Sequence, residues 1–111
     1  MNIAFIGARG TGKTKVSKRL SILLKRPVFS IDELIVYEEG GVTIPEIVSR
    51  KGWKYFRDVE YEVVKKVSKM KEIIIDCGGG IVVDLNEDGK ETFSSRKIDI
   101  LKTNSFIILL N

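Results

Sequence analysis

Histidine is absent from this 111-residue chain, and cysteine and proline are rare, with one and two residues respectively. Without histidine, any proton transfer must use carboxylates, lysine, tyrosine or water. The single cysteine, Cys77, excludes an internal disulfide and suits a reducing compartment. No apolar run approaches the ~20 residues of a membrane-spanning helix, and no basic region precedes the apolar start of the chain, as it would in a signal peptide. The sequence therefore predicts a cytoplasmic protein without a membrane partner.

The excess of positive over negative charge is small: charged residues make up 31% of the chain, but the net charge is only +4. This charge would help to attract ATP or a small acid, but it is too small to indicate a nucleic-acid partner. The basic stretch within residues 65–71 falls on a predicted helix, and we interpret it as a solvated face. The length predicts one domain, residues 1–111, with a single core.

Hydrophobic periodicity and turn residues predict alternating strands and helices. Strands are expected at residues 2–6, 28–29, 73–75 and 106–110, and helices at about 13–25, 30–38, 43–50, 53–69 and 95–102. The apolar face of the first helix is expected to hold Val16, Leu20, Leu23 and Leu24. The core-facing stripe of the longest helix is expected to hold Trp53, Phe56, Val63, Val67 and Met70. Strands that are apolar on both faces are typical of a parallel sheet with helices on both sides, so the predicted fold class is α/β.

Residues Gly7 to Thr14 match the Walker A pattern, G-x-x-x-x-G-K-[ST]. Glycines let the backbone wrap around phosphate, and the following helix presents its positive end to the same anion. The loop leaves a predicted strand and enters an amphipathic helix, as such a site requires. The alternative is a glycine-rich turn that binds no nucleotide, and nothing in the chain resembles a dinucleotide fingerprint.

The Walker A pattern assigns roles within this loop. Lys13 is the candidate catalytic residue, because it can reach the β- and γ-phosphates, and the Thr14 hydroxyl can ligate Mg²⁺. The residues predicted to bind ATP are Gly10, Thr11, Gly12, Lys13, Thr14 and Lys15.

Four further segments resemble the shikimate kinases, which phosphorylate a hydroxyl of a small cyclic carboxylic acid. The similar segments, in family order and at family spacing, are residues 29–35, 44–47, 56–60 and 78–80. The resemblance implies a three-layer P-loop kinase fold, ATP and Mg²⁺ as cofactors, and transfer of phosphate to shikimate or a similar acid, giving shikimate 3-phosphate. The alternatives are another P-loop small-molecule or nucleotide kinase and a non-catalytic nucleotide-binding fragment.

The resemblance also implies substrate-binding residues. Asp32 corresponds to the carboxylate that orients or deprotonates the attacking hydroxyl, and Arg57 to the arginine that holds the acid's carboxylate through two parallel hydrogen bonds. Gly79 belongs to the turn whose backbone N–H groups approach the substrate. Glu60 could fix Arg57 as an i,i+3 pair. The residues alone leave simpler interpretations open. Asp32 could only favour a helix N-terminus by its charge, and Arg57 and Glu60 could be an ordinary surface ion pair. The glycines at 78–80 could be a plain exit from a strand.

At Ser30 the chain departs from the family pattern, which usually has there the first aspartate of Asp-x-Asp, a residue that helps to position Mg²⁺. A serine at this place most simply caps the following helix. Asp76 ends an apolar strand in the Walker B manner, so we hypothesise that it ligates Mg²⁺ together with Thr14 and supplies the charge missing at Ser30. The alternative is an aspartate held only by the glycine turn.

The resemblance also implies that family members continue well past residue 111, with a lid arginine, a second substrate-binding arginine and an adenine-contacting loop. The fold is therefore expected to be incomplete at its C-terminus, and the chain to be a fragment or a truncated product whose catalytic activity is an open question. The strand 106–110 should lie beside the first strand with its other edge open. An open apolar edge favours self-association.

Overall fold

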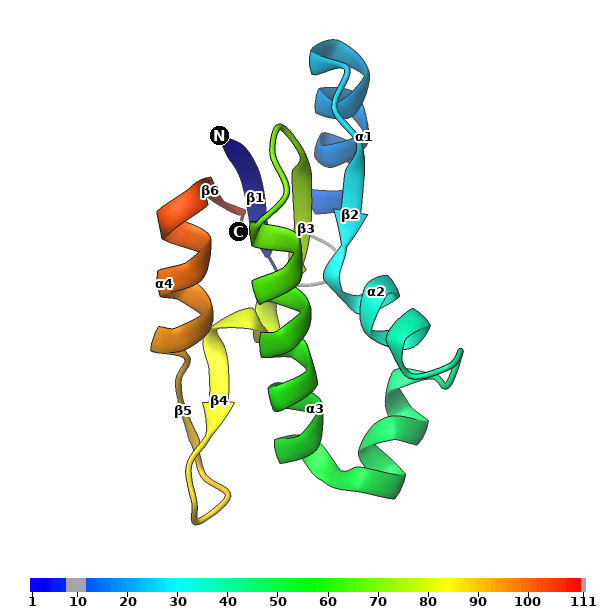
Figure 1. Ribbon diagram of the computed structural model, residues 1–111, viewed down its shortest axis with the longest axis vertical. Helices are drawn as coiled ribbons and strands as arrows, with labels where there is room; N and C mark the ends of the chain where they lie inside the picture. The colour runs from blue at the N-terminus through cyan, green and yellow to red at the C-terminus, as the bar shows by residue number, and fades with distance from the viewer. Residues whose placement is uncertain (8–11, 111) are drawn as a thin grey trace.

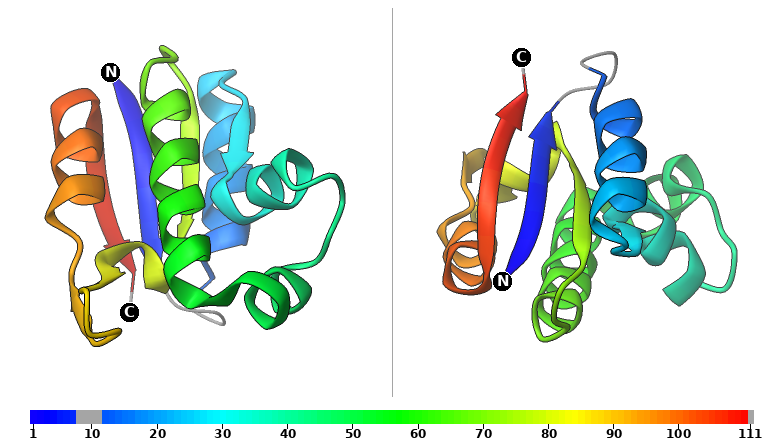
Figure 2. Two further views of the ribbon diagram at one scale, coloured as in Figure 1. Left: turned by 60° about the horizontal axis from the view of Figure 1, so that its bottom comes forward. Right: turned by 90° about the horizontal axis from the view of Figure 1, so that it is seen from above.

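The computed structural model describes residues 1–7 and 12–110. A parallel sheet has the strand order β2-β3-β1-β6, and it comprises β1 (Asn2–Gly7), β2 (Val28–Ser30), β3 (Ile74–Gly78) and β6 (Ser105–Leu110). The helices are α1 (Lys13–Leu24), α2 (Ile31–Glu38), α3 (Ile44–Ser68), the 3₁₀ turn η1 (Gly79–Val82) and α4 (Ser95–Asn104). Helix α1 lies on one face of the sheet, whereas α3 and α4 lie on the other (Figures 1 and 2). The α/β prediction is confirmed.

Strand β1 is central, because it pairs in parallel with both β3 and β6. The predicted position of residues 106–110 beside the first strand is thus confirmed, with Phe5 opposite Ile108. All four parallel strands point their carboxyl ends to the same edge of the sheet, where loops and helix starts gather. This edge holds the end of β1 at Gly7 and the end of β3 at Gly78.

The main core lies between the sheet and the helices α3 and α4. Its fully or almost fully buried members include Ala4, Ile75, Cys77, Val64 and Leu101. Burying each large aliphatic side chain stabilises the fold by about 1.5–3 kcal/mol. Burial also raises the pKa of the Cys77 thiol well above its usual value, so this cysteine stays protonated and acts as a small apolar side chain.

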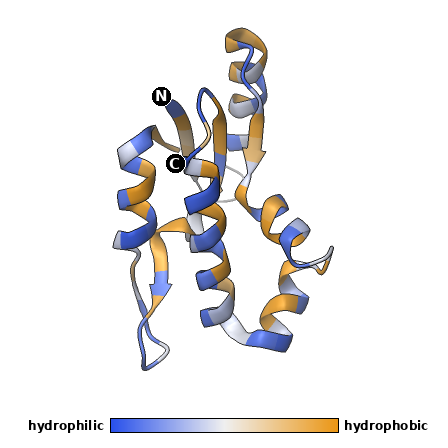
Figure 3. Cartoon of the chain, in the orientation of Figure 1, coloured by the Kyte–Doolittle hydropathy of each residue, from blue (hydrophilic) through white to orange (hydrophobic). Residues whose placement is uncertain are grey.

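Helix α1 does not bury the face that its leucines predict. Ser17 is its buried residue, whereas Val16 and Leu24 are exposed and Leu23 is 76% exposed. The serine hydroxyl donates to the Lys13 carbonyl at 2.8 Å, which satisfies it and lets the helix approach the sheet closely. The apolar end of α1 is visible in Figure 3. Periodicity alone identified the helix, but three of the four residues that it assigned to the core are exposed and the fourth, Leu20, is only half-buried.

Helix α3 contains a break at Gly52, as the sequence predicts. This glycine has φ 87° and ψ 165°, a conformation essentially restricted to glycine, so the two predicted helices meet there at a kink. The start of α3 is capped by Thr43, whose Oγ1 accepts from the Glu46 N–H at 3.4 Å. The predicted core stripe is wrong at its two ends, because Trp53 and Met70 are exposed.

A β-hairpin between η1 and α4 is absent from the sequence prediction, which recognised only a polar turn at residues 86–89. Strands β4 (Val83–Leu85) and β5 (Glu91–Phe93) pair antiparallel. The Asn86 side-chain oxygen accepts from the N–H groups of Asp88 and Lys90, and Gly89 adopts φ 78°. The strands were missed because each has only three residues, too few to show a period of two.

Asp84 anchors this hairpin to the rest of the fold. Its carboxylate accepts from Arg96 Nε and Nη2, both at 2.8 Å, and from the Ser94 hydroxyl at 2.6 Å. Arg96 Nη2 also donates to Asp58 of α3 at 2.8 Å. The hydrogen bonds from Arg96 lower the pKa of Asp84 from 3.8 to about 2, so the native state favours the ionised carboxylate.

Asp84→Asn is expected to lower the free energy of unfolding by about 2 kcal/mol at pH 7. Because the folded pKa lies below the unfolded one, this stabilisation is complete above about pH 5 and is lost as the pH falls from about 4 to 2. Urea denaturation of both proteins at pH 7, 5, 3 and 2.5 measures the difference, with the exposed Asp88→Asn as control. A difference that does not change with pH would contradict the assignment.

Candidate functional site

The first turn of α1 contains the described residues that are predicted to bind phosphate. Gly12 precedes this helix with φ 80° and ψ 9°, a left-handed conformation that glycine adopts without strain. The predicted ATP ligands Lys13, Thr14 and Lys15 occupy the first three helical positions, where free N–H groups and the helix dipole attract an anion. The predicted ligands Gly10 and Thr11 lie outside the described residues.

Lys13 forms an ion pair with Asp76, which joins the start of α1 to the end of β3. Both side chains are largely buried. In the parallel register Asp76 lies opposite Ser30 of β2, and paired residues point to the same face of a sheet. Asp76 therefore lies on the neighbouring strand directly beside Ser30, the position at which the family pattern usually has an aspartate.

The hydroxyl of Ser30 serves as the predicted helix cap. Its Oγ accepts from the Glu33 N–H at 3.3 Å, and Ser30 is the N-cap of α2. The Asp76 carboxylate and the Thr14 hydroxyl are oxygen ligands that suit Mg²⁺, because that ion is usually held by one or two protein carboxylates together with phosphate oxygens and waters. These two residues would hold the ion, as the sequence predicts. In this structure the Asp76 carboxylate is paired with Lys13.

The turn after β3 brings the predicted substrate residues together. A Cβ atom added at Gly78 would lie 3.7 Å from Asp32 Oδ2, and one added at Gly80 would lie 2.8 Å from Arg57 Nη1. The turn therefore has Asp32 of α2 beside its start and Arg57 of α3 beside its end. Gly79 lies between these two contacts. A side chain at residue 80 would have to displace the guanidinium of Arg57, so a glycine here lets the arginine lie against the turn.

The predicted pair of Arg57 and Glu60 is present and is not an ordinary surface pair. Arg57 Nη1 donates to Glu60 Oε1 at 3.1 Å and to the Gly80 carbonyl at 3.2 Å. The two side chains are 14% and 5% exposed. The guanidinium is thus fixed from two directions, which lowers the entropy lost when it binds a ligand.

Lys97 of α4 extends this pair and was missed by the sequence analysis. Its side chain is fully buried, and its ammonium contacts Glu60 Oε1 and donates to the Val83 carbonyl at 2.7 Å. Burial raises the pKa of Glu60 and lowers that of Lys97, and their mutual attraction opposes both effects. The available signal was a lysine four residues before the buried Leu101, on the apolar side of α4.

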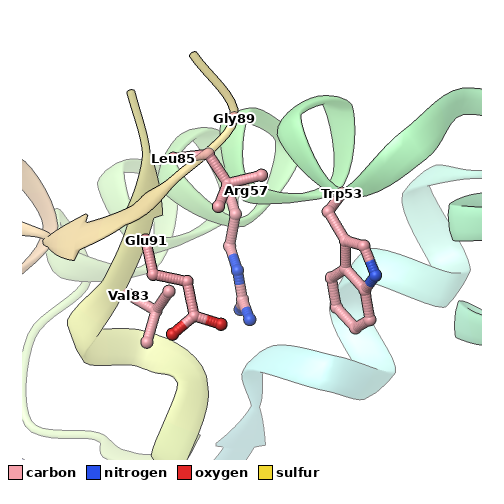
Figure 4. A pocket seen from close by; sticks show the side chains of 6 residues that line it. All are labelled: Trp53, Arg57, Val83, Leu85, Gly89 and Glu91. Atoms are coloured by element: carbon pink, nitrogen blue, oxygen red, sulfur yellow. The ribbon is translucent and has the colours of Figure 1, made fainter. Parts of the chain in front are cut away.

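Arg57 also faces a pocket of about 220 Å³ between α3 and the hairpin. Figure 4 shows the guanidinium pointing into the space between Trp53 and the Glu91 carboxylate. Trp53 is 51% exposed, and its ring lies 5.2 Å from Arg57 Cζ. This arrangement explains why Trp53 is not a core residue. The other residues lining the pocket are Val83, Leu85 and Gly89.

Comparisons with known proteins agree with this geometry. The family model described as shikimate kinase matches residues 9–110. The shikimate kinase of Leptospira biflexa is 50% identical over 110 residues, which cover 99% of this chain and 61% of that protein. The shikimate kinase of Aquifex aeolicus is 34% identical over 99% of this chain and 64% of its own length. The present chain thus spans about three fifths of the length of these relatives.

Two solved structures are similar along almost the whole chain. The crystal structure of Aquifex aeolicus shikimate kinase has a TM-score of 0.82 and 32% identity, covering 100% of this chain and 60% of that one. Acinetobacter baumannii shikimate kinase in complex with shikimate has a TM-score of 0.84 and 28% identity, covering 98% and 55%. With a family model that matches nearly every residue and a fold shared with these enzymes, the chain belongs to the shikimate kinase family.

Proposed function

We propose that this chain provides the phosphate-binding and acid-binding parts of an ATP-dependent kinase that phosphorylates a hydroxyl of shikimate or a closely similar acid. The observation that supports it best is the turn 78–80. It follows β3, whose Asp76 holds Lys13, and it contacts both Asp32 and Arg57. A phosphate-binding helix, a carboxylate and a fixed guanidinium therefore gather at one edge of the sheet. These are the groups that a kinase for a hydroxy acid needs.

In the proposed reaction, Arg57 binds the carboxylate of the acid and Asp32 orients the hydroxyl that attacks the γ-phosphorus of ATP. The bond between the γ-phosphorus and the bridging oxygen of ADP breaks as the new P–O bond forms, and the hydroxyl proton passes to Asp32 or water. Lys13 and the N–H groups of α1 stabilise the charge on the phosphate oxygens. Bound Mg²⁺ would supply further neutralisation of that charge.

A coupled assay of ADP release with ATP, Mg²⁺ and shikimate tests the proposal. Turnover should require shikimate, should be largely lost when Lys13 is replaced, and should need a much higher shikimate concentration when Arg57 is replaced. ADP release that does not depend on shikimate would contradict the acid-binding role and would favour another acceptor. Because the chain spans about 61% of its Leptospira relative, the second candidate is a protein that binds nucleotide without catalysis. In that case ATP would raise the melting temperature of the wild type more than that of Lys13→Ala, and no ADP would form.

Asp76→Asn tests the proposed magnesium role. We expect the Mg²⁺ concentration for half-maximal activity to rise about tenfold or more, since the carboxylate is replaced by a neutral amide. Titration of turnover with Mg²⁺ at saturating ATP gives this value. Asp99→Asn, an exposed substitution on α4, is the matched control. An unchanged Mg²⁺ requirement would contradict the role of Asp76, even if turnover falls through its pair with Lys13.

We propose further that two copies associate through the outer edge of β6. Within residues 1–7 and 12–110, β6 pairs only with β1, and it exposes Phe106 by 62% and Leu109 by 70%. The free backbone groups of an apolar edge strand can pair with a second chain. Sedimentation velocity should show a concentration-dependent dimer that Phe106→Lys/Leu109→Lys abolishes. The pair Ile22→Lys/Leu23→Lys, on the exposed face of α1, should leave the dimer intact. A monomer at all concentrations would contradict the proposal.

None of the helices in the described part of the chain is both long and apolar enough to cross a membrane. The predicted cytoplasmic location is retained as a proposal.

A further inference from the structure

Lys97 is unusual because its side chain is 0% exposed, whereas lysine is almost never fully buried unless it is paired. Its ammonium contacts Glu60 Oε1 and the Val83 carbonyl oxygen, so it reaches α3 and the start of the hairpin from α4. Glu60 Oε1 also accepts from Arg57 Nη1. One carboxylate oxygen is therefore shared between two cations.

This sharing sets the net charge of the buried cluster to which Arg57 belongs. Arg57 and Glu60 alone would sum to zero, and an anion approaching the guanidinium would also meet the carboxylate. Lys97 adds a second positive charge, so the three residues sum to +1. Burial raises the pKa of Glu60 and lowers that of Lys97, so both groups are pushed toward their neutral forms. The net charge of the three residues is +1 in either case, because moving the proton from Lys97 to Glu60 leaves their total charge unchanged.

The hydrogen bonds of Arg57 leave part of the guanidinium available. In the described part of the chain, its bonds to Glu60 and to the Gly80 carbonyl both use Nη1. The Nε and Nη2 donors can then form the two parallel hydrogen bonds that a carboxylate accepts. Arg57 also borders the pocket beside Trp53 (Figure 4).

We propose that Lys97 is a positioning residue for the acid substrate: by pairing with Glu60 it lets Glu60 hold Arg57 without cancelling its positive charge. This inference rests on the proposed function, in which Arg57 binds the carboxylate of the substrate. Lys97 contacts no substrate itself and acts through Glu60 and Arg57.

Trp53 provides a direct measurement, because it is the chain's single tryptophan and its ring lies 5.2 Å from Arg57 Cζ. We would titrate wild type, Lys97→Met and Glu60→Gln/Lys97→Met with shikimate, and separately with sulfate at constant ionic strength, while recording its fluorescence. Lys97→Met should raise the Kd of both anions about tenfold. The double variant restores the sum of +1 and should return to within about threefold of the wild-type Kd.

Steady-state kinetics add a readout that a purely structural role would not produce. Lys97→Met should raise the KM for shikimate and leave the KM for ATP unchanged, and Lys102→Met on the exposed side of α4 should change neither. If Lys97→Met does not fold, Lys97→Gln, which is also neutral but keeps a donor for the Val83 carbonyl, serves for the same comparison.

The outcomes separate this inference from the proposed function. If the wild type does not respond to shikimate but sulfate shows the expected order of affinities, the proposed substrate is wrong and the role of Lys97 stands. Equal sulfate affinities in wild type and Lys97→Met overturn the role of Lys97. A double variant as weak as the single one, or a wild type that responds to neither anion, also overturns it.

Discussion

Lys13→Met is expected to lower the turnover number by about 10²–10³-fold, the scale of removing one preorganised charge-stabilising donor. Lys13 begins α1, and its ion pair with Asp76 fixes the ammonium at the carboxyl end of β3. In the proposed reaction the ammonium would stabilise the negative charge that is redistributed over the phosphate oxygens in the transition state, so the loss should fall mainly on turnover. The N–H groups at the start of α1 remain, and ATP affinity should therefore fall less than turnover does.

Coupled ADP release measures the turnover of Lys13→Met, and the shift of melting temperature with ATP measures binding. Lys18→Met is the matched control, because Lys18 is an exposed lysine on the same helix. Turnover within about threefold of wild type would show that Lys13 does not serve the reaction. Equal losses in Lys13→Met and Lys18→Met would point to the net charge of α1 instead.

The features that the sequence predicted well are those that depend on local chemistry. The helix caps at Ser30 and Thr43 and the break at Gly52 follow from side-chain hydrogen bonding and glycine backbone freedom over a few residues. The prediction that the strand 106–110 lies beside β1 came from the resemblance to shikimate kinases. The meeting of Asp32, Arg57 and the glycine turn came from the same source.

The features that could not be predicted depend on contacts between distant segments. Lys97 lies 37 positions from Glu60, and its place on the apolar side of α4 does not indicate which residue it pairs with. Ser17 replaces the leucines on the buried side of α1 because the sheet can accept a close, small residue there. Trp53 leaves the core because Arg57 and the hairpin form a pocket around it. In each case contacts between distant segments, and not the helical periodicity of the sequence, decide which residues are buried.

Arg57→Met is expected to lower kcat/KM for shikimate by about 10²–10⁴-fold, mainly through a higher KM. Two hydrogen bonds to a charged carboxylate contribute about 1.5–3 kcal/mol each, and no other described group replaces them in the proposed pose. Such a contact is made in the ground state and in the transition state alike, so its loss changes KM more than kcat. The KM for ATP should not change, because Arg57 lies on the acid-binding side of the glycine turn.

The buried network also predicts that Arg57→Met remains folded. Removing one member of a buried ion pair is usually costly, at about 3–5 kcal/mol, because it leaves an unpaired charge. Here Glu60 keeps Lys97 as a partner, so the carboxylate is still neutralised when Arg57 is lost. The melting temperature should therefore fall by only a few degrees. Arg50→Met, an exposed arginine on the same helix, is the control for both kinetics and stability. An unchanged KM for shikimate in a folded Arg57→Met protein would exclude Arg57 as the carboxylate-binding residue. Unfolding of this variant would contradict the neutralisation of Glu60 by Lys97.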